Sequence, residues 1–280
     1  MDSCCLVRAR RRPGCELANG AFAVGNFILL VEDRRPGPTT ERLPWGGGVS
    51  EHQPRHQTAP VDTAPLLTQL HAEVEQFGQL VIAALPGSAG KPVPACEGMV
   101  LAELVRHVSS VHHLVTDWVR DGRRPTAWAF APEVGEELAA WARRGSADML
   151  ETLTGRSPAQ PCATWSATDR TVGFWIRRMA HETAVHRVDA AQALGERWTV
   201  DPELAADGIA EALELWLGTR LGTKVGGSGR AVRLTASAGA SAAVVDWTIR
   251  PLKTIIEFGR GPAGADVTVT GTPAALWAWT

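Results

Sequence analysis

The stretch from Arg177 to Asp189, which reads RRMAHETAVHRVD, decides how this chain is expected to fold. It continues an apolar stripe that repeats in steps of three and four residues, the period of an amphipathic helix: Val172, Trp175, Ile176 and Met179. On the same face the stripe then becomes polar: Glu182, His186 and Asp189. A helix here would therefore carry a carboxylate and an imidazole four residues apart, one above the other. Such a pair can bind one metal ion.

An earlier helical segment also has a polar residue on its apolar face, namely His107. Its neighbours at helical spacing are aliphatic or aromatic: Leu104, Val111, Leu114 and Trp118. His107, Glu182 and His186 are therefore the candidate metal ligands, and a His2Glu set leaves a coordination position open for water or substrate. Two other interpretations stay open. An inward histidine is more often a hydrogen-bonded core residue than a ligand, and the three side chains could simply pair with one another.

Other histidines nearby are weaker ligand candidates. His112 and His113 follow His107 by five and six residues, off its face, and are expected to be partly exposed. His181 is next to Glu182 but turned from it by about 100°.

Two further acids have alternative roles. Glu103 precedes the first candidate histidine by four residues and could compete as a ligand, although a first-turn acid that faces the helix dipole is the simpler interpretation. Asp189 is either a partner that orients an imidazole or a polar residue near a helix end.

Four helices of similar length predict a helical bundle over residues 63–198. Capping residues, prolines and glycines set their ends. The expected spans are Asp62 to the break between Pro86 and Pro94, Val100 to Asp121-Gly122, Pro132 to about Leu153, and a fourth that is capped by Thr168-Asp169 and ends at Gly195.

Residues 199–280 predict a small α+β domain, so the chain as a whole is of the α+β multidomain class. A helix opens at Asp201-Pro202-Glu203 and runs to about Leu221, and Thr272-Pro273 caps a last helix that is cut short at Thr280. Short runs of strand character lie between them: Ala231–Thr235, Ala243–Ile249, Thr254–Phe258 and Asp266–Val269.

The composition is that of a globular protein. Among 280 residues, 28 Lys and Arg stand against 30 Asp and Glu, and 45% are hydrophobic, which argues against a disordered chain and against nucleic-acid binding through bulk basicity. Five cysteines without a CxxC pair form neither a disulfide framework nor a zinc ribbon and indicate a cytoplasmic protein. The apolar stretch at 21–31 is too short to span a bilayer, so no membrane partner is expected. Residues 1–62 are predicted to be a disordered or irregular extension.

Two segments carry a family resemblance. Residues 94–108, PACEGMVLAELVRHV, and 177–190, RRMAHETAVHRVDA, resemble the signatures of the mycothiol-dependent maleylpyruvate isomerase family, which is actinobacterial. The resemblance covers about residues 63–280 and implies a DinB-like metal-binding four-helix bundle followed by a small α+β (sterol-carrier-like) domain. It implies His107, Glu182 and His186 as ligands of a divalent ion, usually zinc, and mycothiol as the thiol cofactor.

The resemblance also implies a reaction. A metal-bound thiolate would add to a cis double bond of a small maleyl substrate, permit rotation and leave as the trans product. Arg177, Arg178 and Arg187 could bind substrate carboxylates, with surface ion pairing as the alternative. The family's carboxyl-terminal helix continues into basic residues that include a catalytic arginine, whereas this sequence ends at Thr280. Thiol S-transfer, or a non-catalytic metal- or ligand-binding or regulatory module with the same fold, are therefore the alternative functions.

Overall fold

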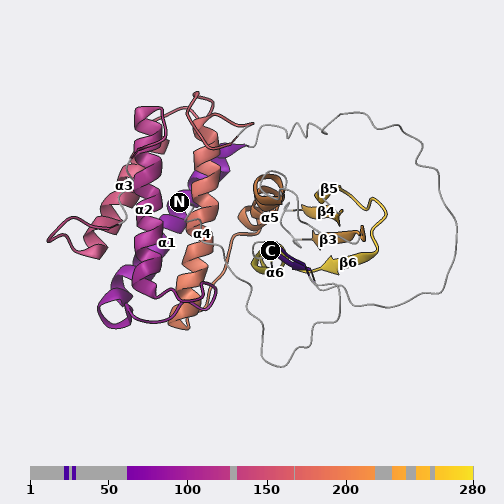
Figure 1. Ribbon diagram of the computed structural model, residues 1–280, viewed down its shortest axis with the longest axis horizontal. Helices are drawn as coiled ribbons and strands as arrows, with labels where there is room; N and C mark the ends of the chain where they lie inside the picture. Colours follow the sequence, from indigo (N-terminus) through magenta and orange to yellow (C-terminus); the bar gives the residue numbers. More distant parts are fainter. Residues whose placement is uncertain are drawn as a thin grey trace, which may run out of the picture.

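The computed structural model describes residues 22–24, 27–29, 62–126, 131–166, 168–217, 229–237, 244–252 and 256–279. Its first large element is a bundle of four helices, which lie side by side in Figure 1. They are α1 (Thr63–Ser88), α2 (Leu101–Asp121), α3 (Leu138–Thr154) and α4 (Val172–Leu194). The predicted bundle and the α+β class of the whole chain are confirmed.

Local chemistry sets the ends of these helices. The carboxylate of Asp62 accepts a hydrogen bond of 3.1 Å from the backbone N–H of Ala64 and so caps α1. The helix continues through Pro86, because a proline in the last turn removes only one late backbone hydrogen bond. The predicted break there lies three residues too early. Gly122 and Gly195 end α2 and α4 in the left-handed conformation, with φ of 65° and 74°.

Two predicted helix starts are wrong. The third helix begins at Leu138 rather than at Pro132, because Gly135 has a φ of 87°, which a right-handed helix does not contain. The fourth has Thr171 as its N-cap rather than Thr168-Asp169. The carboxylate of Asp169 instead accepts a 3.1 Å hydrogen bond from the Thr171 N–H and forms the turn before the helix.

The carboxyl-terminal part contains a four-stranded sheet in the order β5-β4-β3-β6. The strands are β3 (Val232–Ser237), β4 (Val244–Pro251), β5 (Ile256–Arg260) and β6 (Val267–Thr270). β3 pairs antiparallel with β4 and parallel with β6, and β4 pairs antiparallel with β5. The predicted strand runs are thus confirmed to within a few residues.

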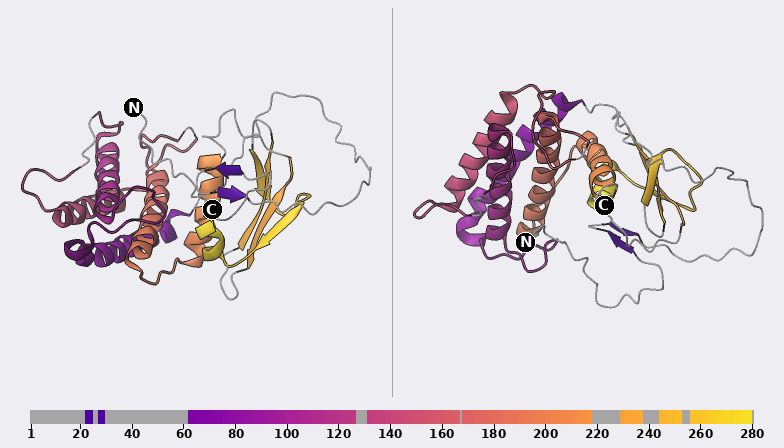
Figure 2. Two further views of the ribbon diagram at one scale, coloured as in Figure 1. Left: turned by 60° about the horizontal axis from the view of Figure 1, so that its bottom comes forward. Right: turned by 45° about the horizontal axis from the view of Figure 1, so that its top comes forward.

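Helices cover the face of this sheet that is turned toward the bundle (Figures 1 and 2). They are α5 (Pro202–Glu211), which continues as one π-helical segment η1 (Ala212–Leu217), and α6 (Pro273–Trp279). The helix predicted to reach Leu221 therefore leaves the α-helical conformation ten residues earlier, and residues 218–228 lie outside the described residues.

The apolar core runs from the bundle into the carboxyl-terminal part. One cluster of buried side chains joins Trp175 of α4 and Leu70 of α1 to Leu204 of α5, Leu234 of β3 and Leu276 of α6. A second cluster fills the opposite end of the bundle around α1 and α2. The division of the chain at 62/63 and 198/199 stays a prediction.

The amino-terminal segment contributes one described feature. β1 (Phe22–Val24) and β2 (Phe27–Leu29) pair as an antiparallel hairpin inside the stretch that the sequence predicts to be irregular. The rest of residues 1–61 lies outside the described residues. None of the helices in the described part of the chain is long and apolar enough to cross a membrane.

Candidate metal centre

Helices α2 and α4 bring the three candidate ligands together. The Nε2 atoms of His107 and His186 each lie 3.1 Å from the same oxygen, Oε1 of Glu182. One donor atom from each residue lies within 4.8 Å of the other two. The two imidazole rings meet edge to face, with centroids 4.9 Å apart. The convergence that the helical spacing predicts is therefore present.

Asp189 orients one of these imidazoles. Its Oδ2 lies 2.9 Å from Nδ1 of His186, which leaves Nε2 directed at Glu182. Burial disfavours a charge on this ring, but the carboxylates of Glu182 and Asp189 outweigh it and raise the pKa of His186 to about 10. Burial likewise opposes ionisation of Glu182, yet His186, His107 and Arg178 hold the pKa of its carboxyl well below the usual range. The site is built to concentrate negative charge against the ring nitrogens.

All three side chains keep a path to solvent. The exposed fractions are 26% for His107, 17% for Glu182 and 14% for His186. The donor set fits a divalent cation, because two imidazoles and one carboxylate suit first-row ions, and three protein ligands leave a coordination position open.

Comparison with known proteins bears on this helical part of the chain. Residues 70–191 match the family model described as the mycothiol maleylpyruvate isomerase N-terminal domain. This segment is similar to that domain. The predicted resemblance is confirmed, and the matched residues include all three candidate ligands.

Two solved structures are similar to the chain. They are the mycothiol-dependent maleylpyruvate isomerase, with 15% identity and a TM-score of 0.44, and a histidine-to-alanine mutant of it, with 13% identity and a TM-score of 0.47. Each similarity covers 78% of this chain and 88% of the other. No curated protein matches the chain.

Within residues 70–191, the other histidines make hydrogen bonds away from the three candidate ligands. His112 is fully buried between Ser146 and Thr183, at 3.0 and 3.1 Å, so the expectation that it is partly exposed is wrong. α3 covers this side of α2, which the spacing on α2 alone could not reveal. Burial lowers the pKa of His112 to about 4, and the nearby Glu182 offsets only part of this effect. His113 is half-buried and lies against Trp141 of α3.

His181 and Glu103 also have partners of their own. His181 Nε2 lies 2.7 Å from Oδ2 of Asp207 on α5. Burial acts to raise the pKa of Asp207, but His181 and Arg177 outweigh it and lower the pKa to about 2. Glu103 accepts a 2.9 Å hydrogen bond from the Val100 N–H at the start of α2, which agrees with its interpretation as a first-turn acid.

The three candidate arginines are held by carboxylates within the protein. Arg177 binds Asp207 at 2.9 Å and Glu214 at 2.7 Å. Arg178 and Arg187 are only 8% and 5% exposed, so surface ion pairing is the wrong description for both. That these three arginines bind substrate carboxylates stays a prediction.

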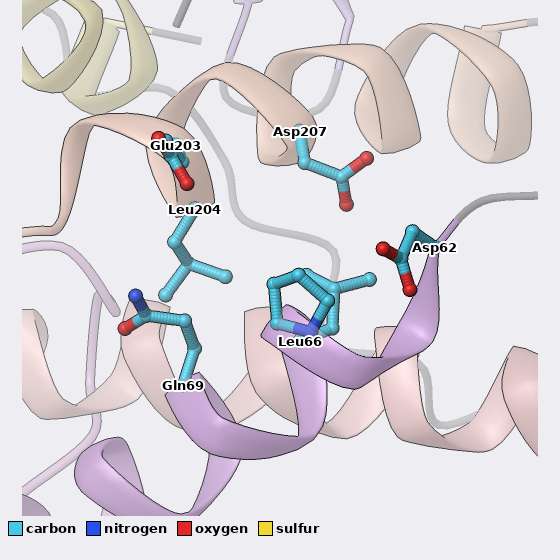
Figure 3. Close-up of a pocket in the computed structure, with 7 residues that line it drawn as sticks. Asp62, Leu66, Gln69, Glu203, Leu204 and Asp207 are labelled. Atoms are coloured by element: carbon cyan, nitrogen blue, oxygen red, sulfur yellow. The ribbon is translucent and has the colours of Figure 1, made fainter. Parts of the chain in front are cut away.

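A pocket between the start of α1 and α5 lies apart from the three ligands (Figure 3). It is lined by Asp62, Pro65, Leu66, Gln69, Glu203, Leu204 and Asp207. Of its three carboxylates, Asp207 is already bound to Arg177 and His181, and Asp62 caps α1. These contacts give two of the three acids, Asp62 and Asp207, structural roles.

The sequence interpretation missed the acids that contact the arginines. Glu211 of α5 binds Arg178, and Glu73 of α1 binds Arg187 through two hydrogen bonds. The only signal for the first is the spacing of Asp207, Glu211 and Glu214, which are four and three residues apart on one helical face.

Proposed function

We propose that this protein is a metal- and mycothiol-dependent enzyme of the maleylpyruvate isomerase family. The reaction class is addition of a thiol to a small electrophilic substrate. Reversible addition to a cis double bond gives a cis–trans isomerase, and retention of the bond to sulfur gives an S-transferase. The observation that carries the proposal is the convergence of His107 and His186 on one oxygen of Glu182 inside a segment similar to this family's N-terminal domain.

In this proposal His107, Glu182 and His186 hold one divalent ion, and zinc is the ion we propose. When bound, the ion would stabilise the ionised form of a coordinated thiol at neutral pH. Asp189 keeps Nδ1 of His186 engaged, so that Nε2 is presented to the site. The partial burial of the three side chains would limit the water around a bound thiol, and their remaining exposure would let a small molecule reach the ion.

A charged neighbour orients the carboxylate of Glu182. Arg178 donates to Oε2 of Glu182 at 2.9 Å and leaves Oε1 directed at the two imidazoles. The five cysteines and the thiol chemistry support a reducing, cytoplasmic setting as part of the proposal.

Metal content is the first test. Protein purified without chelators is expected to contain close to one divalent ion per chain by elemental analysis, and His186→Ala should abolish this content. His71→Ala is the matched control, because His71 is an exposed histidine of α1 whose Nε2 lies 3.1 Å from the hydroxyl of Thr154. Wild-type protein that neither retains nor takes up Zn²⁺ would overturn the proposal.

Turnover is the second test. Metal-loaded protein is supplied with mycothiol and either a maleyl substrate or an electrophile, and the trans product or the thiol adduct is followed. Thiol binding without either product would favour the alternative, a non-catalytic metal- or ligand-binding module with the same fold.

A further inference from the structure

An acidic face on α5 and η1 meets two adjacent arginines of α4. Arg177 donates two hydrogen bonds, of 2.9 and 3.0 Å, to the carboxylate of Asp207 and one of 2.7 Å to the carboxylate of Glu214. Arg178 binds Glu211 instead. The neighbouring arginines therefore use different acids of the same face, and α5 lies beside α4 in both Figure 1 and Figure 2.

Arg178 connects this face to the candidate metal centre. Its Nη1 donates to Oε2 of Glu211, and its Nη2 donates to Oε2 of Glu182 at 2.9 Å. The other oxygen of Glu182, Oε1, faces both imidazoles. One guanidinium thus fixes which oxygen of Glu182 is presented to the ligand histidines.

The buried position of Glu211 calls for an explanation. Its side chain is 2% exposed, and among the described residues its Oε1 has no hydrogen-bond partner. A buried carboxylate with an unsatisfied oxygen is costly, since such groups are nearly always hydrogen-bonded in folded proteins. The other oxygen of Glu211, Oε2, accepts a hydrogen bond from Arg178.

We infer that Glu211 is a positioning residue for the metal centre, acting through Arg178 on Glu182. The charges decide the argument. With Glu211 present, its carboxylate neutralises much of the Arg178 charge, so the negative charge of Glu182 can stabilise a bound cation. Without it, the buried guanidinium of Arg178 would draw more of its compensating charge from Glu182, 2.9 Å away, and the cation and the arginine would compete for that carboxylate. The metal centre of the bundle would then depend on a helix outside the bundle.

This inference rests on the proposed function, because it requires that the three ligands bind a metal. The test is the Zn²⁺ affinity of the full chain, measured by competition with a chromophoric chelator. Glu211→Gln is expected to weaken binding by about 10–100-fold, the usual effect of losing a group that supports a metal ligand. Glu214→Gln removes an acid from the same face that binds Arg177 rather than Arg178, and it should stay within about twofold of wild type.

A double variant separates charge competition from a merely structural role. In Glu211→Gln with Arg178→Met the competing cation is absent, so Zn²⁺ affinity should recover at least about tenfold over Glu211→Gln alone. The absorption bands of bound Co²⁺ give an independent readout, because Glu211→Gln should change the coordination of the ion and the double variant should restore it. If Glu211→Gln does not fold, the double variant against wild type carries the comparison, and loss of binding in it overturns the inference.

The outcomes distinguish the two proposals. Wild type that binds Zn²⁺ while Glu211→Gln binds equally well overturns the role of Glu211 and leaves the metal centre standing. Failure of the double variant to recover affinity also overturns this role. Wild type that does not bind Zn²⁺ overturns both proposals.

Discussion

The buried ion pair between Glu73 and Arg187 is expected to be essential for the bundle. It joins α1 to α4, and the two side chains are 2% and 5% exposed. Arg187 donates twice to the Glu73 carboxylate and once, at 2.6 Å, to the carbonyl of Thr199. Glu73→Leu removes two charge-assisted hydrogen bonds at roughly 1.5–3 kcal/mol each and leaves a buried guanidinium with one carbonyl. We expect a loss of about 3–5 kcal/mol in the free energy of unfolding, the usual cost of removing one partner of a buried pair.

The assay is urea unfolding of metal-free protein, because a bound ion would raise the apparent stability of every variant. Trp118 and Trp175, whose rings are 5.0 Å apart in the bundle core, report the transition by fluorescence. Circular dichroism must give the same midpoint for a two-state treatment to hold. The control is Glu73→Leu combined with Arg187→Met, which leaves no unpaired charge and should recover most of the loss. A single variant within about 1 kcal/mol of wild type would refute the reasoning.

Three further predictions follow from single contacts. Asp189→Asn removes the carboxylate behind a ligand imidazole and should lower Zn²⁺ affinity by about 10–100-fold in a chelator competition; unchanged affinity would show that Asp189 does not orient the ring. The pKa of His112 falls from 6.5 to about 4 on folding, so the unfolded chain binds the extra proton and stability is complete above pH 6.5 and lost as the pH falls toward 4. Between pH 6.5 and pH 4 the free energy of unfolding, measured by urea unfolding at a series of pH values, should fall by roughly 3 kcal/mol because of this group. In His112→Gln this pH dependence should be weaker. Gly208→Ala would place a Cβ 2.6 Å from Nε1 of Trp277 and should lower the melting temperature, with a cost of about 1–3 kcal/mol. In the control Gly78→Ala, the new Cβ would lie 3.8 Å from Cδ1 of Ile82, an ordinary contact, so that variant should melt at or above the wild-type temperature.

Helix periodicity was enough to predict the bundle, and short runs of strand character predicted the strands, but two of the helix starts were wrong. The spans around Trp175 and Val108 are set by apolar side chains that recur at the helical period, so the sequence alone contains them. The starts at Pro132 and at Thr168-Asp169 are wrong because turn residues compete for the same signals. Gly135 takes a positive φ, and Asp169 uses its carboxylate in a turn rather than in a cap.

The three converging side chains were predictable for a specific reason. Glu182 and His186 are four residues apart on one helix, and His107 interrupts an apolar stripe on another, so each is visible without knowledge of the fold. The partners of the arginines are not visible in this way. Arg178 and Glu211 are 33 residues apart, on helices whose contact depends on how the carboxyl-terminal part packs against α4. His112 was misjudged for the same reason, since α3 is what buries it.

One segment of α4 carries both candidate metal ligands and the arginines that bind the acids of α5. Its candidate ligands Glu182 and His186 contact His107 of α2, whereas Arg177 and Arg178 bind acids of α5. Adjacent positions on a helix differ by about 100°, so neighbouring residues can contact different helices. The four-residue step from Arg178 to Glu182 returns to the same face and places the guanidinium beside a ligand carboxylate, at 2.9 Å. A substitution on α5 can therefore alter the candidate metal centre without touching any of its ligands.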